Sequence, residues 1–142
     1  MPLAAEEQNL KFKFVTFELE SSAVESVTFD ADAKTGNTLL VGKSAGVAIF
    51  EDGRIAVKRF VYFGDIDQDG FAGKGYSTYD FGGGDALNFS FTVKNGGGDY
   101  TVVSGTGAYE GATGTGRFDE IDSPWEGANN YNGSFKLDVP GS

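Results

Sequence analysis

The chain has 142 residues, with 11 Lys and Arg against 21 Asp and Glu, so its formal net charge is −10. It contains no His and no Cys, which excludes a Ser-His-Asp triad, a Cys nucleophile, a disulfide framework and an ordinary structural zinc site. The negative charge argues against binding to nucleic acid, and no apolar run approaches the roughly 20 residues that a membrane span needs.

The length fits one domain, which we place at residues 10–139. Residues 1–9 lack the periodic pattern that follows them, and we expect a flexible N-terminal segment there. They also lack a basic stretch followed by an apolar one, so no signal peptide is visible. These features predict a soluble protein that is either cytoplasmic or processed.

The first predicted strand starts at Leu10 and changes the phase of its alternation near Val15, where apolar side chains move from even to odd positions. Such a change indicates a β-bulge, or a strand covered on both faces. Glu18 and Glu20 are two residues apart and are predicted to share one face. They either form a polar outer face, with Phe17 inside, or place Glu18 in an apolar interior, where burial would make it a base or a charge stabiliser.

Further runs with a period of two follow along the chain, at residues 24–30, 38–50, 54–63, 73–81, 86–94, 100–105, 115–121 and 131–139. Turn clusters with Asp-Gly and Asn-Gly pairs separate many of them, and no segment has a convincing helical period. About eight short strands of this kind predict an all-β sandwich or antiparallel barrel. Glycines within the strands, such as Gly42 and Gly75, favour a closed and strongly bent sheet. A barrel of eight strands is filled by side chains or holds one small ligand.

Asp65, Asp67 and Asp69 reproduce the first half of a calcium-binding loop, D-x-D-x-D-G. Tyr76 occupies the position where an EF-hand needs Glu, and the flanking segments are strand-like, so an EF-hand is excluded. A looser calcium site at a strand turn stays open beside the favoured interpretation, a solvated hairpin tip. We therefore predict no metal site.

Two pairs of residues are candidates for the interior of the barrel. Tyr76 and Tyr79 are three residues apart, so they face opposite sides of a strand and one of them is expected to point inward. Lys58 and Arg59 interrupt an otherwise apolar run, which makes one of them a candidate for the interior. A solvent-facing position is the commoner outcome for such a residue.

Five segments, taken in order, resemble the allene oxide cyclase family, with a weaker likeness to dirigent proteins of the same barrel class. The segments lie between residues 14 and 118 and are F-E-L-E at 17–20, S-A-G at 44–46, Y-F-G-D at 62–65, G-Y-S-T-Y-D at 75–80 and V-S-G-T-G-A-Y-E-G at 103–111. The resemblance implies a single closed eight-stranded antiparallel β-barrel with a hydrophobic cavity, usually assembled as a trimer. It also implies cofactor-free rearrangement of a fatty-acid epoxide into a cyclopentenone.

Carried over by position, the resemblance makes Glu18 the catalytic carboxylate that stabilises developing positive charge, and Tyr76 the catalytic Tyr of the cavity. It places Glu20, Ala48 and Ile55 at substrate-binding positions.

Several of these positions depart from the family pattern. Glu20 stands where the family has an Asn that holds a water, Ala48 replaces a Cys and Ile55 replaces a Phe. The family has a second water-holding Asn, and its position falls near Ala31 in this sequence. These departures argue against the fatty-acid epoxide as the substrate of this chain.

The leading hypothesis is a barrel that binds a lipid- or polyketide-like molecule and steers its cyclisation or isomerisation without a cofactor. The alternatives are a non-catalytic, lipocalin-like binding barrel and a dirigent-like guide for a coupling performed by another enzyme. The expected partners are a hydrophobic small molecule and further copies of the chain in a homotrimer.

Overall fold

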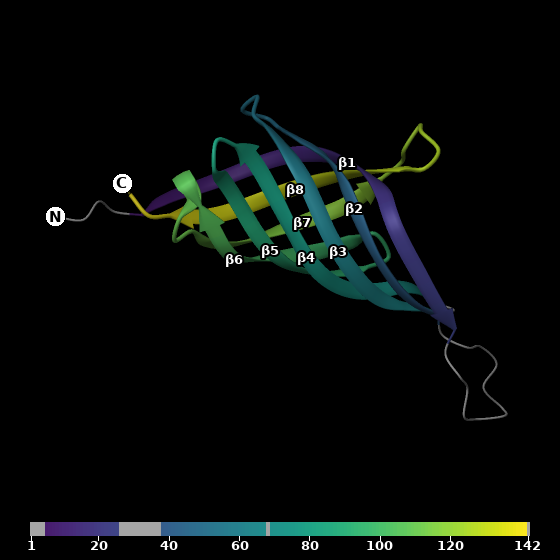
Figure 1. Ribbon diagram of the computed structural model, residues 1–142. Coiled ribbons are helices and arrows are strands. Elements are labelled where there is room, and N and C mark those ends of the chain that lie inside the picture. Colours follow the sequence, from purple (N-terminus) through teal and green to yellow (C-terminus); the bar gives the residue numbers. More distant parts are fainter. Residues whose placement is uncertain (1–4, 26–37, 68, 142) are drawn as a thin grey trace.

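The computed structural model describes residues 5–25, 38–67 and 69–141, which form one closed antiparallel β-barrel with neighbouring strands in chain order (Figure 1). Pairing of β1 with β8 closes the barrel. The elements are β1 (Glu6–Glu25), β2 (Thr38–Phe50), β3 (Ile55–Asp67), β4 (Gly70–Gly82), β5 (Asp85–Lys94), β6 (Gly97–Thr106), the 3-10 helix η1 (Gly107–Tyr109), β7 (Thr113–Ile121) and β8 (Ala128–Val139). The predicted fold class is therefore confirmed.

The first strand begins at Glu6, which pairs with Val139, so it starts four residues before the predicted boundary at Leu10. No helix among the described residues is long and apolar enough to cross a membrane.

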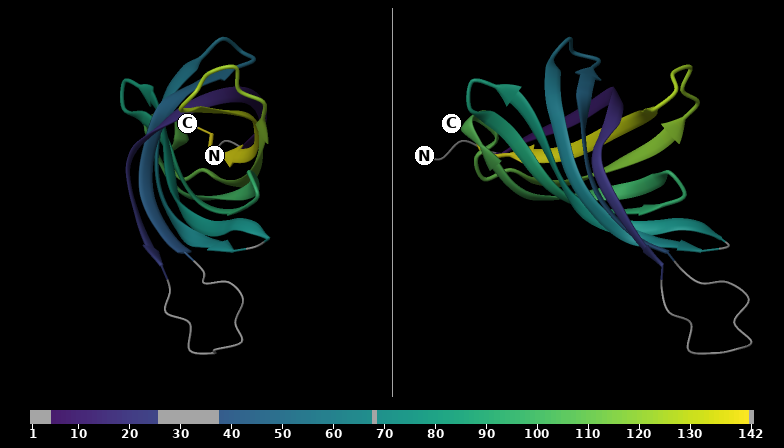
Figure 2. Two further views of the ribbon diagram at one scale, coloured as in Figure 1. Left: turned by 90° about the vertical axis from the view of Figure 1, so that its right-hand side faces the viewer. Right: turned by 45° about the vertical axis from the view of Figure 1, so that its right-hand side comes forward.

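The two ends of the barrel differ in what they carry. Both chain termini lie at one end, together with the turns at 51–54 and 82–84 and the crossing at 107–112 (Figure 1). We call this the terminal end. The β3–β4 hairpin tip, the turn at 95–96 and the loop at 122–127 lie at the opposite end, which we call the mouth, and Figure 2 shows the ring of strands from that side.

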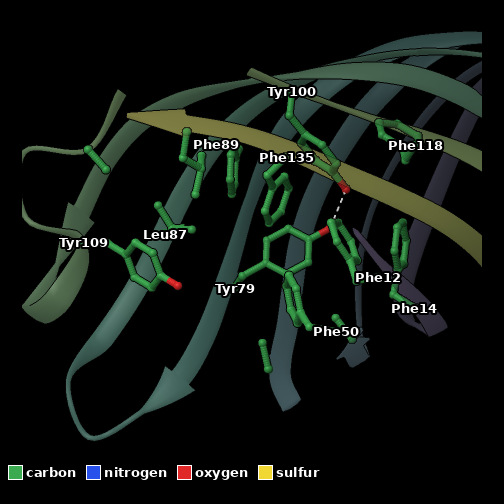
Figure 3. Close-up of a cluster of buried hydrophobic side chains, with 14 of the residues drawn as sticks. Phe12, Phe14, Phe50, Tyr79, Leu87, Phe89, Tyr100, Tyr109, Phe118 and Phe135 are labelled. Carbon is green, nitrogen blue, oxygen red and sulfur yellow. Dashed lines mark hydrogen bonds between the residues drawn. The ribbon is translucent and has the colours of Figure 1, made fainter. Parts of the chain in front are cut away.

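Aromatic side chains fill the barrel toward the terminal end (Figure 3). Phe135 lies at the centre of this packing, with its ring centroid 4.5 Å from those of Phe12 and Phe89. Arg54 closes the end, because its guanidinium lies 4.8 Å from the centroid of the Phe81 ring and donates a hydrogen bond to the Tyr109 hydroxyl. Packed rings of this kind leave this part of the barrel filled with side chains.

Small residues on β2 leave room for long side chains on β3. Three small, inward-facing residues of β2 pair with large or charged residues of β3, in the pairs Gly42–Tyr62, Ser44–Phe60 and Gly46–Lys58. At Gly46 a Cβ atom would lie 1.8 Å from the carbonyl oxygen of Val15, so only glycine fits this close approach of β1 and β2. The small residues therefore let the side chains of β3 cross the barrel.

The β-bulge of β1 lies later than predicted. Pairing with β2 runs without interruption from Phe12 to Glu18 and shifts between Glu18 and Glu20, which makes Leu19 the extra residue. A bulge in this strand was predicted, but the change of phase near Val15 does not mark its position, and Phe17 lies on the outer face with 53% of its surface exposed. The outer face of this strand is itself apolar, so the hydrophobic pattern did not distinguish the inside from the outside.

Candidate functional site

A cavity of about 420 Å³ occupies the barrel between the packed core and the mouth. Its volume falls in the range of small-molecule sites, about 300–1,000 Å³. Five phenylalanine side chains line its wall, namely Phe14, Phe60, Phe71, Phe91 and Phe118. Polar groups gather at its floor and at its mouth, which is the arrangement that holds a ligand in one orientation.

The floor of the cavity is built around Lys58, which is only 2% exposed. Its Nζ atom lies 2.8 Å from Ser77 Oγ, 2.8 Å from the Tyr79 hydroxyl and 2.7 Å from the Tyr100 hydroxyl. The two phenol oxygens are themselves 2.6 Å apart and share a hydrogen bond (Figure 3). This buried cluster of an amine and three hydroxyl groups comes from β3, β4 and β6.

Lys58 makes no ion pair with any carboxylate among the described residues, and burial lowers its pKa well below the ordinary value of 10.5. Aromatic rings surround the amine instead, with Nζ 4.3 Å from the Tyr79 centroid and 4.5 Å from that of Phe14. Burial also raises the pKa of Tyr79 and of Tyr100, so both phenols hold their protons. The floor is therefore a set of hydrogen-bond donors in an apolar setting.

Two pairs of a tyrosine and a carboxylate line the cavity near its mouth. The hydroxyl of Tyr62 donates a 2.7 Å hydrogen bond to Oε1 of Glu18, and burial together with this carboxylate raises the pKa of Tyr62 to about 12. Burial, and then the charge and hydrogen bond of Glu120, raise the pKa of Tyr131. The backbone N–H of Glu120 is held by the carbonyl of Gly96 at 2.9 Å. The cavity thus has donors at its floor and carboxylates at its mouth.

The structure separates the two glutamates that the spacing had placed on one face. Glu18 points inward and lines the cavity, but it is exposed at the mouth and does not lie in the enclosed interior. Glu20 lies on the outer face, where its carboxylate is 3.2 Å from Lys43 Nζ. The extra residue Leu19 reverses the alternation between them. The substrate-binding position predicted for Glu20 is therefore wrong.

Tyr76 also lies outside the barrel, with 64% of its surface exposed, so its predicted place in the cavity is wrong. It pairs with the outward-facing Val61 of β3, whereas Tyr79 pairs with the inward-facing Lys58. One tyrosine of the pair does point inward, as the spacing predicted, and it is Tyr79.

The two remaining substrate-binding candidates do not line the cavity. Ile55 lies at the start of β3 near the terminal end and is 59% exposed, because it pairs with the outward-facing Ile49. Ala48 does face inward and is fully buried, but it pairs with Ala56 within the packed core. Neither residue therefore lies at a cavity position, because Ile55 faces outward and Ala48 lies in the filled part of the barrel.

Other predictions fall wholly or partly beyond the described part of the chain. Ala31 lies outside it, as do Gln68 and the side chain of Asp67. The segment from Asp65 to Asp69 is the tip of the β3–β4 hairpin, where Asp67 pairs with Gly70. Among the described residues, no group of three acidic side chains is placed to hold a metal ion.

Lys58 is the main residue to which the sequence assigned no role. In the sequence, an inward position of Lys58 was indicated only by the two adjacent cations that interrupt an apolar run. This pattern left open whether Lys58 or Arg59 points inward. Arg59 is exposed on the outer face. Ser77 and Tyr100, which complete the floor, gave no signal of their own, because they belong to strands far apart in the sequence.

No family model matches the sequence, and a search of curated proteins finds no match. Solved structures are similar to it in fold. The pterocarpan synthase dirigent protein GePTS1 superimposes with a TM-score of 0.64 at 15% sequence identity, over 96% of this chain and 89% of that one. The pterocarpan synthase dirigent protein PsPTS1 gives a TM-score of 0.57 at 12% identity and covers 99% of both chains. The chain therefore has a barrel of the dirigent type.

Proposed function

We propose that this protein is a dirigent-like barrel that holds an apolar, aromatic small molecule in its cavity and fixes the stereochemistry of its ring closure. The observation that carries the proposal is the cavity of about 420 Å³, which has aromatic side chains in its wall and polar groups at its floor and its mouth. The likeness of the fold to dirigent proteins described as pterocarpan synthases supports it. The allene oxide cyclase hypothesis has less support, since Tyr76, Glu20 and Ile55 lie outside the cavity.

The chemistry proposed for the cavity needs no nucleophile and no cofactor. An apolar wall that bends a flexible molecule into one conformer removes the entropy cost of ring closure, and the enclosed site excludes water. The hydroxyl of Tyr100 at the floor would donate to an oxygen that gains negative charge. Glu18 at the mouth would stabilise the positive charge at the other end of the molecule.

Occupation of the cavity can be tested by blocking it. N-phenyl-1-naphthylamine, a neutral dye that fluoresces in apolar surroundings, is expected to bind the wild-type chain saturably at one site. Ser44→Leu adds a side chain that points into the cavity, whereas Ala45→Leu adds the same side chain on the outer face, so it is the matched control. The substitution at Ser44 should weaken binding at least tenfold, and equal effects of both substitutions would refute the site.

Stereochemical steering can be tested with 2′-hydroxychalcone, which closes to a flavanone without any other reagent. The chain should produce one enantiomer in excess, as measured by chiral chromatography. Glu18→Gln should lower this excess, because it removes the charge at the mouth, while Glu20→Gln on the outer face should leave it unchanged. A racemic product together with saturable dye binding would support the lipocalin-like binding barrel and overturn the steering.

We also propose that the barrel associates with further copies of itself through the outer face of β2 and β3. Apolar residues meet there in exposed cross-strand pairs, namely Val41–Phe63, Val47–Val57 and Ile49–Ile55. Exposed apolar pairs of this kind are typical of an interface, and Lys43 and Arg59 lie between the first pair and the other two. A second copy suits this outer face, because identical chains can repeat one head-to-tail contact around a closed ring. A homotrimer, implied by the family resemblance, predicts three times the chain mass in analytical ultracentrifugation, and Val57→Asp should yield monomers.

A further inference from the structure

The amine of Lys58 has a role that the packing of the barrel does not require. A methionine of similar length would fill the same space without the cost of burying an ionisable group. Lys58 nevertheless lies at the floor of a cavity, is 2% exposed and makes no ion pair with a described carboxylate. Buried lysines of this kind can act as nucleophiles, because desolvation disfavours the ammonium form.

The hydrogen bonds of the floor are consistent with a neutral amine. A neutral Nζ has two hydrogens and one lone pair, so two of its three hydroxyl partners accept a hydrogen bond and the third donates one. The bond between Tyr79 and Tyr100 uses one phenol proton. Of the four groups, Lys58 and Tyr100 line the cavity. A ligand therefore meets the amine and a phenol side by side.

We infer that Lys58 is a nucleophile that captures an apolar aldehyde or ketone as an imine at the floor of the cavity. The inference rests on the proposed function, since it assigns the chemical class of the ligand that the cavity takes. A carbonyl group fits this floor because its carbon can meet Nζ while its oxygen lies near the Tyr100 hydroxyl. The aromatic walls then hold the body of the ligand.

The reaction balances with the groups present. The lone pair of Nζ attacks the carbonyl carbon, the C=O π pair moves to oxygen, and a proton passes from nitrogen to that oxygen to give a carbinolamine. The Tyr100 phenol then donates a proton to the hydroxyl group, which departs as water while the nitrogen lone pair forms the C=N bond of a protonated imine. Nζ then transfers its remaining proton to the Tyr100 phenolate. The net change is amine plus carbonyl to imine plus water.

Every titratable group near the amine belongs to a tyrosine or lies toward the mouth. Tyr79 from β4 and Tyr100 from β6 contact Nζ. Glu18, Tyr62, Glu120 and Tyr131 line the same cavity from β1, β3, β7 and β8 and make their contacts with one another. No described carboxylate holds the amine as an ammonium, so the phenols are free to act as its proton donors.

The test uses 1-phenylbutane-1,3-dione, an aryl diketone that condenses with neutral amines to a stable, ultraviolet-absorbing enaminone. The full chain is incubated with it at pH 7, and peptides are mapped by mass spectrometry for a gain of one diketone minus one water. The other described lysines are all exposed, namely Lys11, Lys13, Lys43, Lys74, Lys94 and Lys136. An exposed lysine is neutral in about one molecule in 3,000 at pH 7. Lys58 should therefore react at least tenfold faster than any of them.

Matched variants separate capture at Lys58 from general lysine labelling. Lys58→Met should lose the enaminone band, whereas Lys74→Met, an exposed lysine on the neighbouring strand, should keep it. Tyr100→Phe keeps the amine and removes the proton donor, so it should slow the reaction at Lys58. If Lys58→Met does not fold, protection of wild-type Lys58 by saturating N-phenyl-1-naphthylamine supplies the same evidence.

Three outcomes would overturn the inference, and they are distinguishable from one another. Saturable binding of the dye without modification of Lys58 would refute the imine and leave the proposed ligand cavity standing. Absence of both dye binding and modification would refute the cavity as a ligand site, and with it the inference. Equal labelling of Lys58 and the exposed lysines would also refute it, because the amine would then have no special reactivity.

Discussion

The buried amine of Lys58 makes the stability of the fold depend on pH in a defined direction. Its pKa in the folded chain lies well below 10.5, the value expected when the chain unfolds, because burial disfavours the ammonium. Between the two pKa values, the unfolded chain binds one more proton than the folded chain at this site. The free energy of unfolding must therefore rise with pH through this window.

The size of this pH dependence follows from the one proton that Lys58 binds in the unfolded chain only. Each pH unit inside the window adds about 1.4 kcal/mol to the contribution of Lys58, so two units add about 2.7 kcal/mol. Lys58→Met removes this contribution, and we expect the difference in unfolding free energy between wild type and variant to change by about 1.4 kcal/mol for each pH unit between the two pKa values. Urea denaturation at half-unit steps measures it, with Lys74→Met as the control that should parallel wild type.

Parallel pH profiles of wild type and Lys58→Met would refute the argument, because they would mean that Lys58 has the same pKa in both states. If the variant does not fold, the ¹³Cε resonance of Lys58 in the wild-type chain gives the titration directly. Above pH 10 the direction reverses. Burial raises the pKa values of Tyr79 and Tyr100, so the folded chain keeps protons that the unfolded chain loses.

Three further substitutions test the packing that supports the cavity, each by urea denaturation. Thr16→Val should stabilise the fold by about 1 kcal/mol, because the buried Oγ1 of Thr16 has no hydrogen-bond partner among the described residues; a loss of stability would indicate a missed partner. Gly46→Ala should cost about 1–3 kcal/mol, since its Cβ would meet the Val15 carbonyl oxygen, and a neutral effect would contradict that close approach. Phe135→Ala should cost about 3–5 kcal/mol, because its ring packs against Phe12 and Phe89; a cost below 1 kcal/mol would show that this end is loosely packed.

The sequence predicts the fold because alternation and turn chemistry act locally. Each hairpin is specified by its own Gly, Asn and Asp residues, and β1 closes the ring with β8 once eight strands follow one another. The glycines of β2 also carried information. They indicated a bent and closed sheet, and at Gly46 the backbones of β1 and β2 approach too closely to leave room for a Cβ atom.

The site was less predictable because the barrel is apolar on both faces. In β3 the outward Val57 and the inward Ala56 are both apolar. The residue types therefore do not show which of the two cations that follow, Lys58 or Arg59, points inward. In β1 a single bulge at Leu19 reverses the orientation of Glu20 relative to Glu18. Only the register of neighbouring strands decides these orientations, and a single sequence does not contain that register.

A chain without His or Cys must build reactive groups from lysine, tyrosine and carboxylates, and the barrel does so by controlling burial. Lys58 lies in the packed part, where the loss of water lowers its pKa well below the ordinary value. Glu18 lies at the mouth, where its side chain is exposed. The same cavity therefore presents a buried amine with phenol donors at one end and carboxylate side chains at the other. A ligand with a carbonyl at one end and a region of developing positive charge at the other would have one favoured direction of entry, which is the condition for forming one stereoisomer.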